Sequence, residues 1–215
     1  FNTGFSMESS RLSETMDGPS VLWMKSVAES RNCVVGGSVI IEDGGKFFNR
    51  FIWVNPDGSN HYYDKRHLFR MANEHEFFSQ GTERIVIEYK GWKICPLICY
   101  DLRFPVWSRN DEQFDLLIYV ANWPAPRVDA WSTLLKARAI ENQCYCIGVN
   151  RIGKDDADRA YVGGSAVHDP KGALLSNFKH NQEGVEVFKL ELEPLNEFRK
   201  KFPVDLDRDQ FTIEA

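Results

Sequence analysis

The stretch "GWKICPLICYDLRFP", Gly91–Pro105, decides the fold because it joins an apolar run to a polar turn through a cysteine. A cysteine inside an apolar run is usually filler, since the free side chain is small and apolar. Cys99 instead ends the run, and a polar turn follows at once. The pattern predicts a strand that carries the Cys99 thiol to a sheet edge, followed by a turn that supplies backbone N–H donors and a rigid exit at Pro105.

The segments on both sides of this stretch alternate between strand and helix patterns. Apolar and polar residues at helical spacing follow Pro19, which suits a first helical turn, and residues 129–143 carry a longer apolar stripe. Short runs separated by turns predict strands at the following segments: 33–65 (three strands, with turns at 43–45 and 56–58), 84–99 (two strands around a turn at 90–91), 114–124, 144–153, 161–176 and 184–193. An α/β domain with mixed sheets is expected, and with no linker or repeat we expect a single domain over residues 1–215.

The composition excludes several classes of protein. The chain has 215 residues and a formal net charge of -5, with no lysine-arginine block, which argues against a general nucleic-acid binder. It contains no run of 18 apolar residues and no charged-then-apolar leader, so we expect no membrane partner and a cytoplasmic location.

The five cysteines are an odd count in a chain too large to need disulfides, so we expect reduced thiols. Zinc binding is the competing interpretation. It is disfavoured because Cys95 and Cys99 lie at different positions of one strand-like run, and one is expected to be more deeply buried than the other. Cys144 and Cys146 alternate in another apolar run that has no nearby histidine.

A nucleophilic Cys99 requires a base and a nearby positive charge. None of the five histidines lies in a context that suggests a Cys-His pair. Lys65 closes the predicted strand "HYYDK" and therefore also stands at a strand end, although a solvated surface charge is the plainer interpretation of a single lysine. Two strand ends carrying Lys65 and Cys99 are expected to meet at one edge of a sandwich.

The residues around these two positions resemble the nitrilase, or carbon-nitrogen hydrolase, superfamily. Its nucleophile strand, Cys-Tyr-Asp-x-Arg-Phe-Pro, is matched at residues 99–105, and its lysine strand, Tyr-x-Lys-x-His-Leu, at residues 63–68. A glutamate precedes a glycine after the lysine loop, where Glu74 ahead of Gly81 fits better than Glu76. Further matches in family order are "ANW" at 121–123, Arg-Ala-x-Glu-Asn at 138–142 and Ser-x-x-x-x-Pro-x-Gly at 165–172.

The resemblance implies a four-layer α-β-β-α sandwich and an acyl-transfer hydrolysis that needs no cofactor. Cys99 would attack an amide carbon and form a thioester, releasing ammonia before water releases the acid. Lys65 and the backbone N–H of Tyr100 would stabilise the oxyanion, and Glu74 would position the lysine. Trp123 would form a wall of the substrate pocket.

The chain is most similar to the bacterial ω-amidase branch, at "YDKRHLFRMA", "CYDLRFPVWSRN", "ANWPAPR" and "FRKKFPVDLD". The substrates implied are monoamides of small dicarboxylic acids, such as α-ketoglutaramate or α-ketosuccinamate. A cationic side chain is expected to bind their carboxylate, and Arg103 and Arg127 are the candidates. Arg103 has a competing role, in which it holds the turn after Cys99 by pairing with a local carboxylate.

Two other functions remain open at this stage. One is an N-carbamoyl amino acid amidohydrolase, and the other is a non-catalytic binding protein with a nitrilase-like fold. The resemblance also implies a homodimer formed through a helical face. Residues 129–143 are a candidate for that face, although intramolecular packing explains their apolar stripe equally well.

The sequence departs from the family pattern at its start. The family's general base is a glutamate at the end of a first long strand, immediately before text resembling "FNTGFSM", and this sequence begins at Phe1. Glu8 is the nearest acid, but it follows the Gly4 turn. We therefore expect an N-terminally incomplete domain that is part of a longer protein. Without its base, the 215-residue polypeptide is expected to hydrolyse amides slowly or not at all.

Overall fold

The computed structural model describes residues 2–213, which form an α/β fold divided into two compact units, Phe1–Ile85 and Val86–Ala215. The sheets are of mixed type, as the sequence predicted. Among the described residues, no helix combines the length and the apolar character needed to cross a bilayer. The two units are described in turn.

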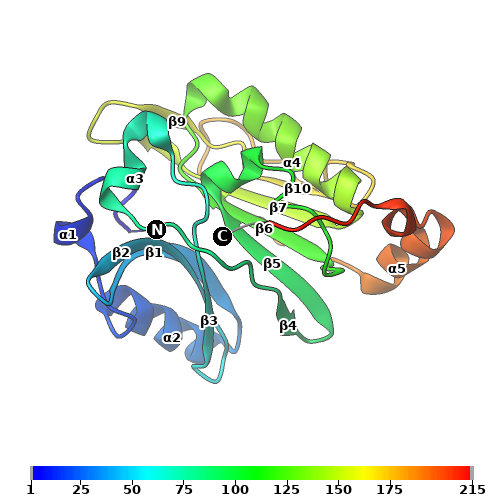
Figure 1. Ribbon diagram of the computed structural model, residues 1–215, viewed down its shortest axis with the longest axis horizontal. Helices are drawn as coiled ribbons and strands as arrows, with labels where there is room; N and C mark the ends of the chain where they lie inside the picture. The colour runs from blue at the N-terminus through cyan, green and yellow to red at the C-terminus, as the bar shows by residue number, and fades with distance from the viewer. Residues whose placement is uncertain (1, 214–215) are drawn as a thin grey trace. The chain divides into compact units, whose positions relative to one another are not determined.

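The first unit is built on a three-stranded antiparallel sheet of β1 (Val35–Asp43), β2 (Lys46–Val54) and β3 (Asn60–Asp64). The turn between β1 and β2 places Gly44 and Gly45 at φ +58° and +74°, values that favour glycine. Helix α2 (Pro19–Arg31) begins with the predicted proline and lies along one face of the sheet (Figure 1). Shorter elements complete the unit: α1 (Ser9–Leu12), η1 (Arg70–Ala72) and α3 (Glu74–Phe77).

The core of the first unit lies between α2 and this sheet. Residues at i, i+3 and i+7 of the helix meet alternate residues of two strands, because side chains on a strand alternate between its faces. The buried members are Val21, Met24 and Ala28 from α2, Val39 and Ile41 from β1, and Ile52 and Val54 from β2. The predicted helix and hairpin therefore form one helix-on-sheet layer pair.

The second unit contains a five-stranded sheet in the order β10-β7-β6-β5-β4. The central strands β5 (Trp92–Ile98), β6 (Leu116–Ala121) and β7 (Tyr145–Asn150) are parallel, and the outer strands β4 (Ile87–Tyr89) and β10 (Ala166–His168) are antiparallel to their neighbours. The remaining elements are η2 (Cys99–Arg103), η3 (Ala125–Arg127), α4 (Val128–Asn142), β8 (Ile152–Lys154), β9 (Ala160–Val162), α5 (Leu192–Lys201) and η4 (Val204–Asp207).

Helix α4 crosses from β6 to β7 and packs on β7 and β10 (Figure 1). Trp131, Leu135 and Ala139 are fully buried on its inner face. Gly148 of β7 allows this approach, since a Cβ there would lie 2.4 Å from Leu135 Cδ1. The apolar stripe of residues 129–143 is therefore used in packing within the second unit.

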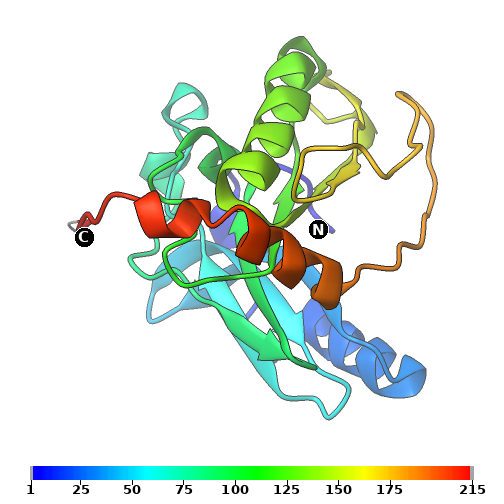
Figure 2. The ribbon, with the colours of Figure 1, turned by 90° about the vertical axis from the view of Figure 1, so that its right-hand side faces the viewer.

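The prediction of a strand at residues 184–193 is wrong. Residues 184–191 have no strand partner among the described residues, and Figure 2 shows them as a single extended run between β10 and α5, while residues 192 and 193 begin α5. Val185 and Val187 are 93% and 94% exposed. Alternating residues favour extended backbone, but a strand also requires a neighbour to complete its hydrogen-bond ladder.

Candidate active site

In the second unit, several of the predicted site residues lie at the carboxyl ends of the parallel strands. Cys99 directly follows β5, Trp123 lies two residues after β6, and Asn150 ends β7. Parallel strands present their carboxyl ends at one sheet edge, where ligands of α/β proteins commonly bind. The Cys99 Sγ lies 4.0 Å from the carbonyl oxygen of Asn122, which places the ends of β5 and β6 side by side.

Cys99 stands in a constrained turn. Its φ of +46° is unusual for a residue with a side chain, since such a conformation costs roughly 1–3 kcal/mol and persists only where its surroundings impose it. The buried Asp101 carboxylate accepts the Ile98 N–H at 3.0 Å and thereby closes the turn across Cys99. The thiol is half-buried, and the amide of Tyr100 follows it in the first turn of η2. The turn therefore has the form expected for a nucleophile at a strand end.

Trp123 is held rigidly beside this turn by its backbone and its indole. Its N–H donates to Asn150 Oδ1 at 2.8 Å, and its carbonyl accepts from Asn150 Nδ2 at 3.0 Å. The indole Nε1 donates to the Arg127 carbonyl at 2.7 Å, and the side chain is 3% exposed. Asn150 was not predicted as a site residue; the available signal was a polar side chain near the end of the strand predicted at residues 144–153.

The arginine predictions have different outcomes. Arg103 forms no ion pair with a carboxylate among residues 2–213, so the expected pairing with a local carboxylate is wrong. Its exposed guanidinium instead lies 5.2 Å from the ring centre of Trp123, a distance suited to a cation–π contact. Arg127 contributes its backbone carbonyl to the indole, and its side chain is half-buried.

Lys65 belongs to the first unit and is not a solvated surface charge. It directly follows β3, and its Nζ lies 2.5 Å from Glu74 Oε2. The two side chains are 1% and 0% exposed. The ring centre of Phe5 lies 5.7 Å from the ammonium group. The structure thus pairs the lysine with the glutamate that the sequence favoured, while Glu76 is exposed.

The Glu74 carboxylate is fixed by three donors. Besides the lysine, the Phe69 N–H donates to it at 2.6 Å and Asn49 Nδ2 at 3.4 Å. A buried ion pair is tolerated only when hydrogen bonds satisfy its remaining polar groups, and this pair has them. Asn49 lies 25 residues from Glu74 in sequence, so no local pattern identified it.

Gly81 lets the chain that follows Glu74 pack closely against the backbone of Lys65. Its N–H donates to the Lys65 carbonyl at 2.9 Å. A Cβ at this position would lie 2.1 Å from the Asp64 carbonyl oxygen, so only glycine fits without moving the backbone. Glu8, by contrast, lies outside this arrangement and pairs with Arg11, both side chains being more than half exposed.

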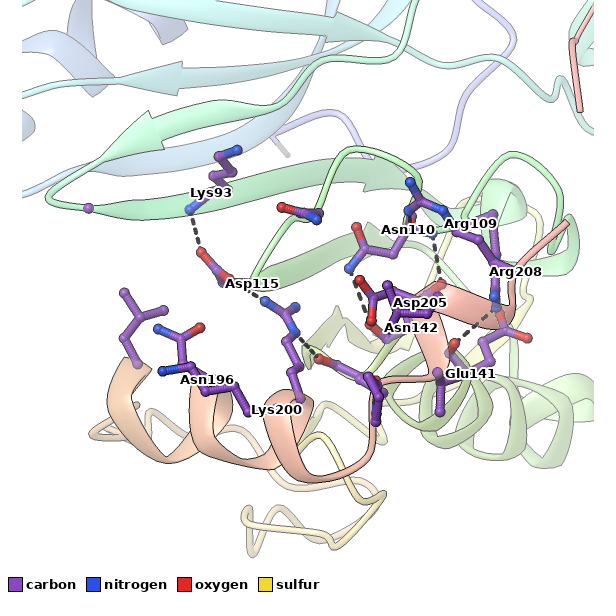
Figure 3. A pocket seen from close by; sticks show the side chains of 18 residues that line it. Lys93, Arg109, Asn110, Asp115, Glu141, Asn142, Asn196, Lys200, Asp205 and Arg208 are labelled. Carbon is purple, nitrogen blue, oxygen red and sulfur yellow. Dashed lines mark hydrogen bonds and ion pairs between the residues drawn. The ribbon is translucent and has the colours of Figure 1, made fainter. Parts of the chain in front are cut away.

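A pocket of about 620 Å³ lies at the opposite, amino-terminal ends of β5 and β6 (Figure 3). No predicted site residue lines it. Arg199, from α5, donates to Asp115 Oδ1 at 2.7 Å, to the Phe114 carbonyl at 2.7 Å and to the Gln143 carbonyl at 2.9 Å. These contacts anchor α5 to the sheet, and they identify this side of the unit as a structural junction.

The other cysteines have environments that differ from that of Cys99. Cys95, Cys144 and Cys146 are fully buried, and Cys33 is exposed on the first unit. Burial raises the pKa of the Cys144 thiol well above its usual value and does the same for Cys146. These two thiols are therefore protonated and poorly nucleophilic at neutral pH. Within residues 2–213, no three His, Cys, Asp or Glu side chains are grouped closely enough to hold a metal ion.

Comparisons with known proteins identify relatives over nearly the whole of this chain. The chain is 46% identical over 213 residues to omega-amidase YafV of Escherichia coli K12, covering 99% of this chain and 83% of the relative. It is 35% identical to the 2-oxoglutaramate amidase of Bacillus subtilis, over 88% of this chain and 74% of that enzyme. The crystal structure of XC1258 from Xanthomonas campestris, a CN-hydrolase superfamily protein, matches with a TM-score of 0.95 and 45% identity. That match covers 98% of this chain and 82% of the other.

A family model described as carbon-nitrogen hydrolase matches residues 1–200. The match extends over both units and includes both the lysine and the cysteine segments. The chain therefore belongs to the carbon-nitrogen hydrolase family.

Proposed function

We propose that this protein is an ω-amidase that hydrolyses monoamides of small dicarboxylic acids, such as α-ketoglutaramate. The observation that carries the proposal is the half-buried thiol of Cys99, held at φ +46° at the carboxyl end of β5 beside a fixed tryptophan. Relatives that carry the names ω-amidase and 2-oxoglutaramate amidase support the choice of amide.

In the proposed reaction, the Cys99 sulfur attacks the carbonyl carbon of the amide. The carbonyl electron pair moves to oxygen, and the Lys65 ammonium and the Tyr100 N–H stabilise the resulting oxyanion. The oxyanion then collapses, the C–N bond breaks, and ammonia leaves with the proton that the thiol gave up. Water attacks the remaining thioester, releases the carboxylic acid and returns the thiol.

Supporting roles follow from the contacts of each remaining residue. Glu74 holds the Lys65 ammonium through a contact of 2.5 Å and fixes its direction. Trp123 forms a rigid wall because three hydrogen bonds hold it. Arg103 and Arg127 are candidates for the substrate carboxylate. Arg103 is the better placed of the two, since its guanidinium is exposed beside that wall.

To test this function, ammonia release is measured for a panel of substrates, with the protein expressed from its complete gene. We expect kcat/KM for α-ketoglutaramate to exceed that for N-carbamoyl amino acids by at least about 100-fold. An N-carbamoyl α-amino acid also carries a carboxylate and an amide, but they are one atom closer together, so its amide carbon lies away from the attacking sulfur when its carboxylate is bound. Carbon dioxide released together with ammonia from the carbamoyl compounds would instead identify a carbamoylase.

We further propose that the protein is a cytoplasmic homodimer. The outer face of α4 supports this, because the apolar side chain of Ile140 is 46% exposed there. Light scattering of the purified protein measures the assembly, and a mass that stays at one chain across micromolar concentrations would contradict the dimer.

A further inference from the structure

The nucleophile turn is tied to helix α4 by one buried arginine. Arg138 lies in the middle of the last two turns of α4, is 3% exposed, and donates from Nη2 to the Leu102 carbonyl at 2.6 Å. Leu102 is the fourth residue of η2, the short turn that begins with Cys99. We propose that Arg138 is a positioning residue that holds the Cys99 thiol in its reactive orientation.

The geometry of Arg138 suits this role. Its Nη1 donates to Glu141 Oε1 at 2.8 Å, one helical turn further along α4, which fixes the guanidinium from the helix side. Its Nε has no hydrogen-bond partner among residues 2–213. The two terminal nitrogens thus connect a rigid helix with the turn, and a charge-assisted hydrogen bond of this kind is stronger than a neutral one.

The turn needs an external restraint because it is short and starts in an unfavourable conformation. A 3-10 turn of five residues has poor hydrogen-bond geometry, and Cys99 at φ +46° persists only where neighbouring groups impose that value. The Asp101 carboxylate restrains the turn from within the same segment. Arg138 restrains it from a different element, 36 residues away in sequence.

A second group of contacts holds the chain that leaves the turn. Asn142, one helical turn after Arg138, donates from Nδ2 to the Ser108 carbonyl at 2.9 Å, and the Tyr119 hydroxyl donates to Ser108 Oγ at 2.8 Å. Helix α4 therefore holds the chain after Cys99 at several points, which include Leu102, Ser108 and Asn110. Of the contacts named here, that of Arg138 falls within the turn that starts with Cys99.

This inference rests on the proposed function only in taking Cys99 as the nucleophile. Arg138 reaches the Leu102 backbone, not the reacting atoms, so its loss acts through the position of the thiol. Misplacing a reacting group by about 1 Å can cost roughly 100-fold in rate. The effect should appear in kcat and in the reactivity of the thiol, with little change in KM.

The test compares Arg138→Met with Arg138→Lys in the protein expressed from its complete gene. For Arg138→Met we expect kcat to fall about 30- to 100-fold at a KM within about threefold of wild type. The rate of Cys99 alkylation by iodoacetamide, followed by peptide mass mapping, should fall in parallel. Lysine keeps the charge and can form one of the two hydrogen bonds that the arginine makes. Arg138→Lys should therefore lose only about 3- to 10-fold in both quantities.

Arg199→Met is the matched control, because Arg199 also donates to a backbone carbonyl within the second unit but at the opposite sheet edge. It should lower the melting temperature yet leave kcat and Cys99 alkylation within about twofold of wild type. The proposal is overturned if Arg138→Met behaves like Arg199→Met. If Arg138→Met does not fold, Arg138→Lys decides, and wild-type values for that variant overturn the proposal.

The two measurements separate this inference from the substrate assignment. A wild-type protein that releases no ammonia from ω-amides would contradict the proposed function. The ratio of Cys99 alkylation rates between wild type and the Arg138 variants does not depend on any substrate. A normal alkylation rate in those variants would therefore overturn the positioning role alone.

Discussion

The Cys99→Ala variant is expected to lose ω-amide hydrolysis by at least about 10⁴-fold, since removing a nucleophile removes the covalent route itself. No other thiol can replace it. Cys144 and Cys146 are buried with raised pKa values, and Cys33 lies in the exposed loop that leads into β1. Because Cys99 is only half-buried, the free energy of unfolding should change by no more than about 1 kcal/mol.

Ammonia release and intact-mass spectrometry together check this result. Wild type quenched in acid during turnover should carry a mass increase equal to the acyl group, and Cys99→Ala should carry none. Cys33→Ala is the matched control and should retain both the activity and the adduct. Hydrolysis by Cys99→Ala at the wild-type rate would exclude the thioester route.

The same variants distinguish the enzyme from a non-catalytic binding protein with this fold. An activated thiol should react with iodoacetamide faster at Cys99 than at the more exposed Cys33. Buried Cys95, Cys144 and Cys146 serve as internal references, because they should react only after unfolding. Slower labelling of Cys99 than of Cys33 would favour the binding protein.

The strand that ends at Cys99 could be predicted from sequence because the signal is local. An apolar run, a cysteine and a polar turn occupy consecutive positions, and β5 ends at Ile98 as expected. The hairpin between β1 and β2 was predictable for the same reason, since its glycines occupy the left-handed conformations that the turn requires.

Features that depend on distant partners could not be predicted in this way. The segment 184–193 has a strand pattern, yet pairing depends on a neighbour that the pattern does not contain. Asn49 and Asn150 contact residues 25 and 27 positions away. Arg138 did carry a signal, since an arginine within an apolar helical stripe implies a buried cation that needs an acceptor.

The second large effect is expected at the buried pair of Lys65 and Glu74. Lys65→Met should lower kcat by about 100- to 1,000-fold, because it removes a proposed donor to the oxyanion. It should also lower the free energy of unfolding by about 3–5 kcal/mol, since it leaves the Glu74 carboxylate buried without its counter-charge. Activity and stability therefore fall together in this variant, and the single substitution does not separate the two causes.

The double variant Lys65→Met/Glu74→Gln separates them. Glutamine keeps an acceptor for the Phe69 N–H but carries no charge, so most of the lost stability should return while kcat stays low. Glu76→Gln is the matched control, because this exposed glutamate should change stability by less than about 0.5 kcal/mol. Urea unfolding and ammonia release measure the two quantities. If kcat recovered with stability in the double variant, Lys65 would be a structural residue whose charge the reaction does not use. If stability recovered while kcat stayed low, the loss of activity would be due to the missing ammonium group.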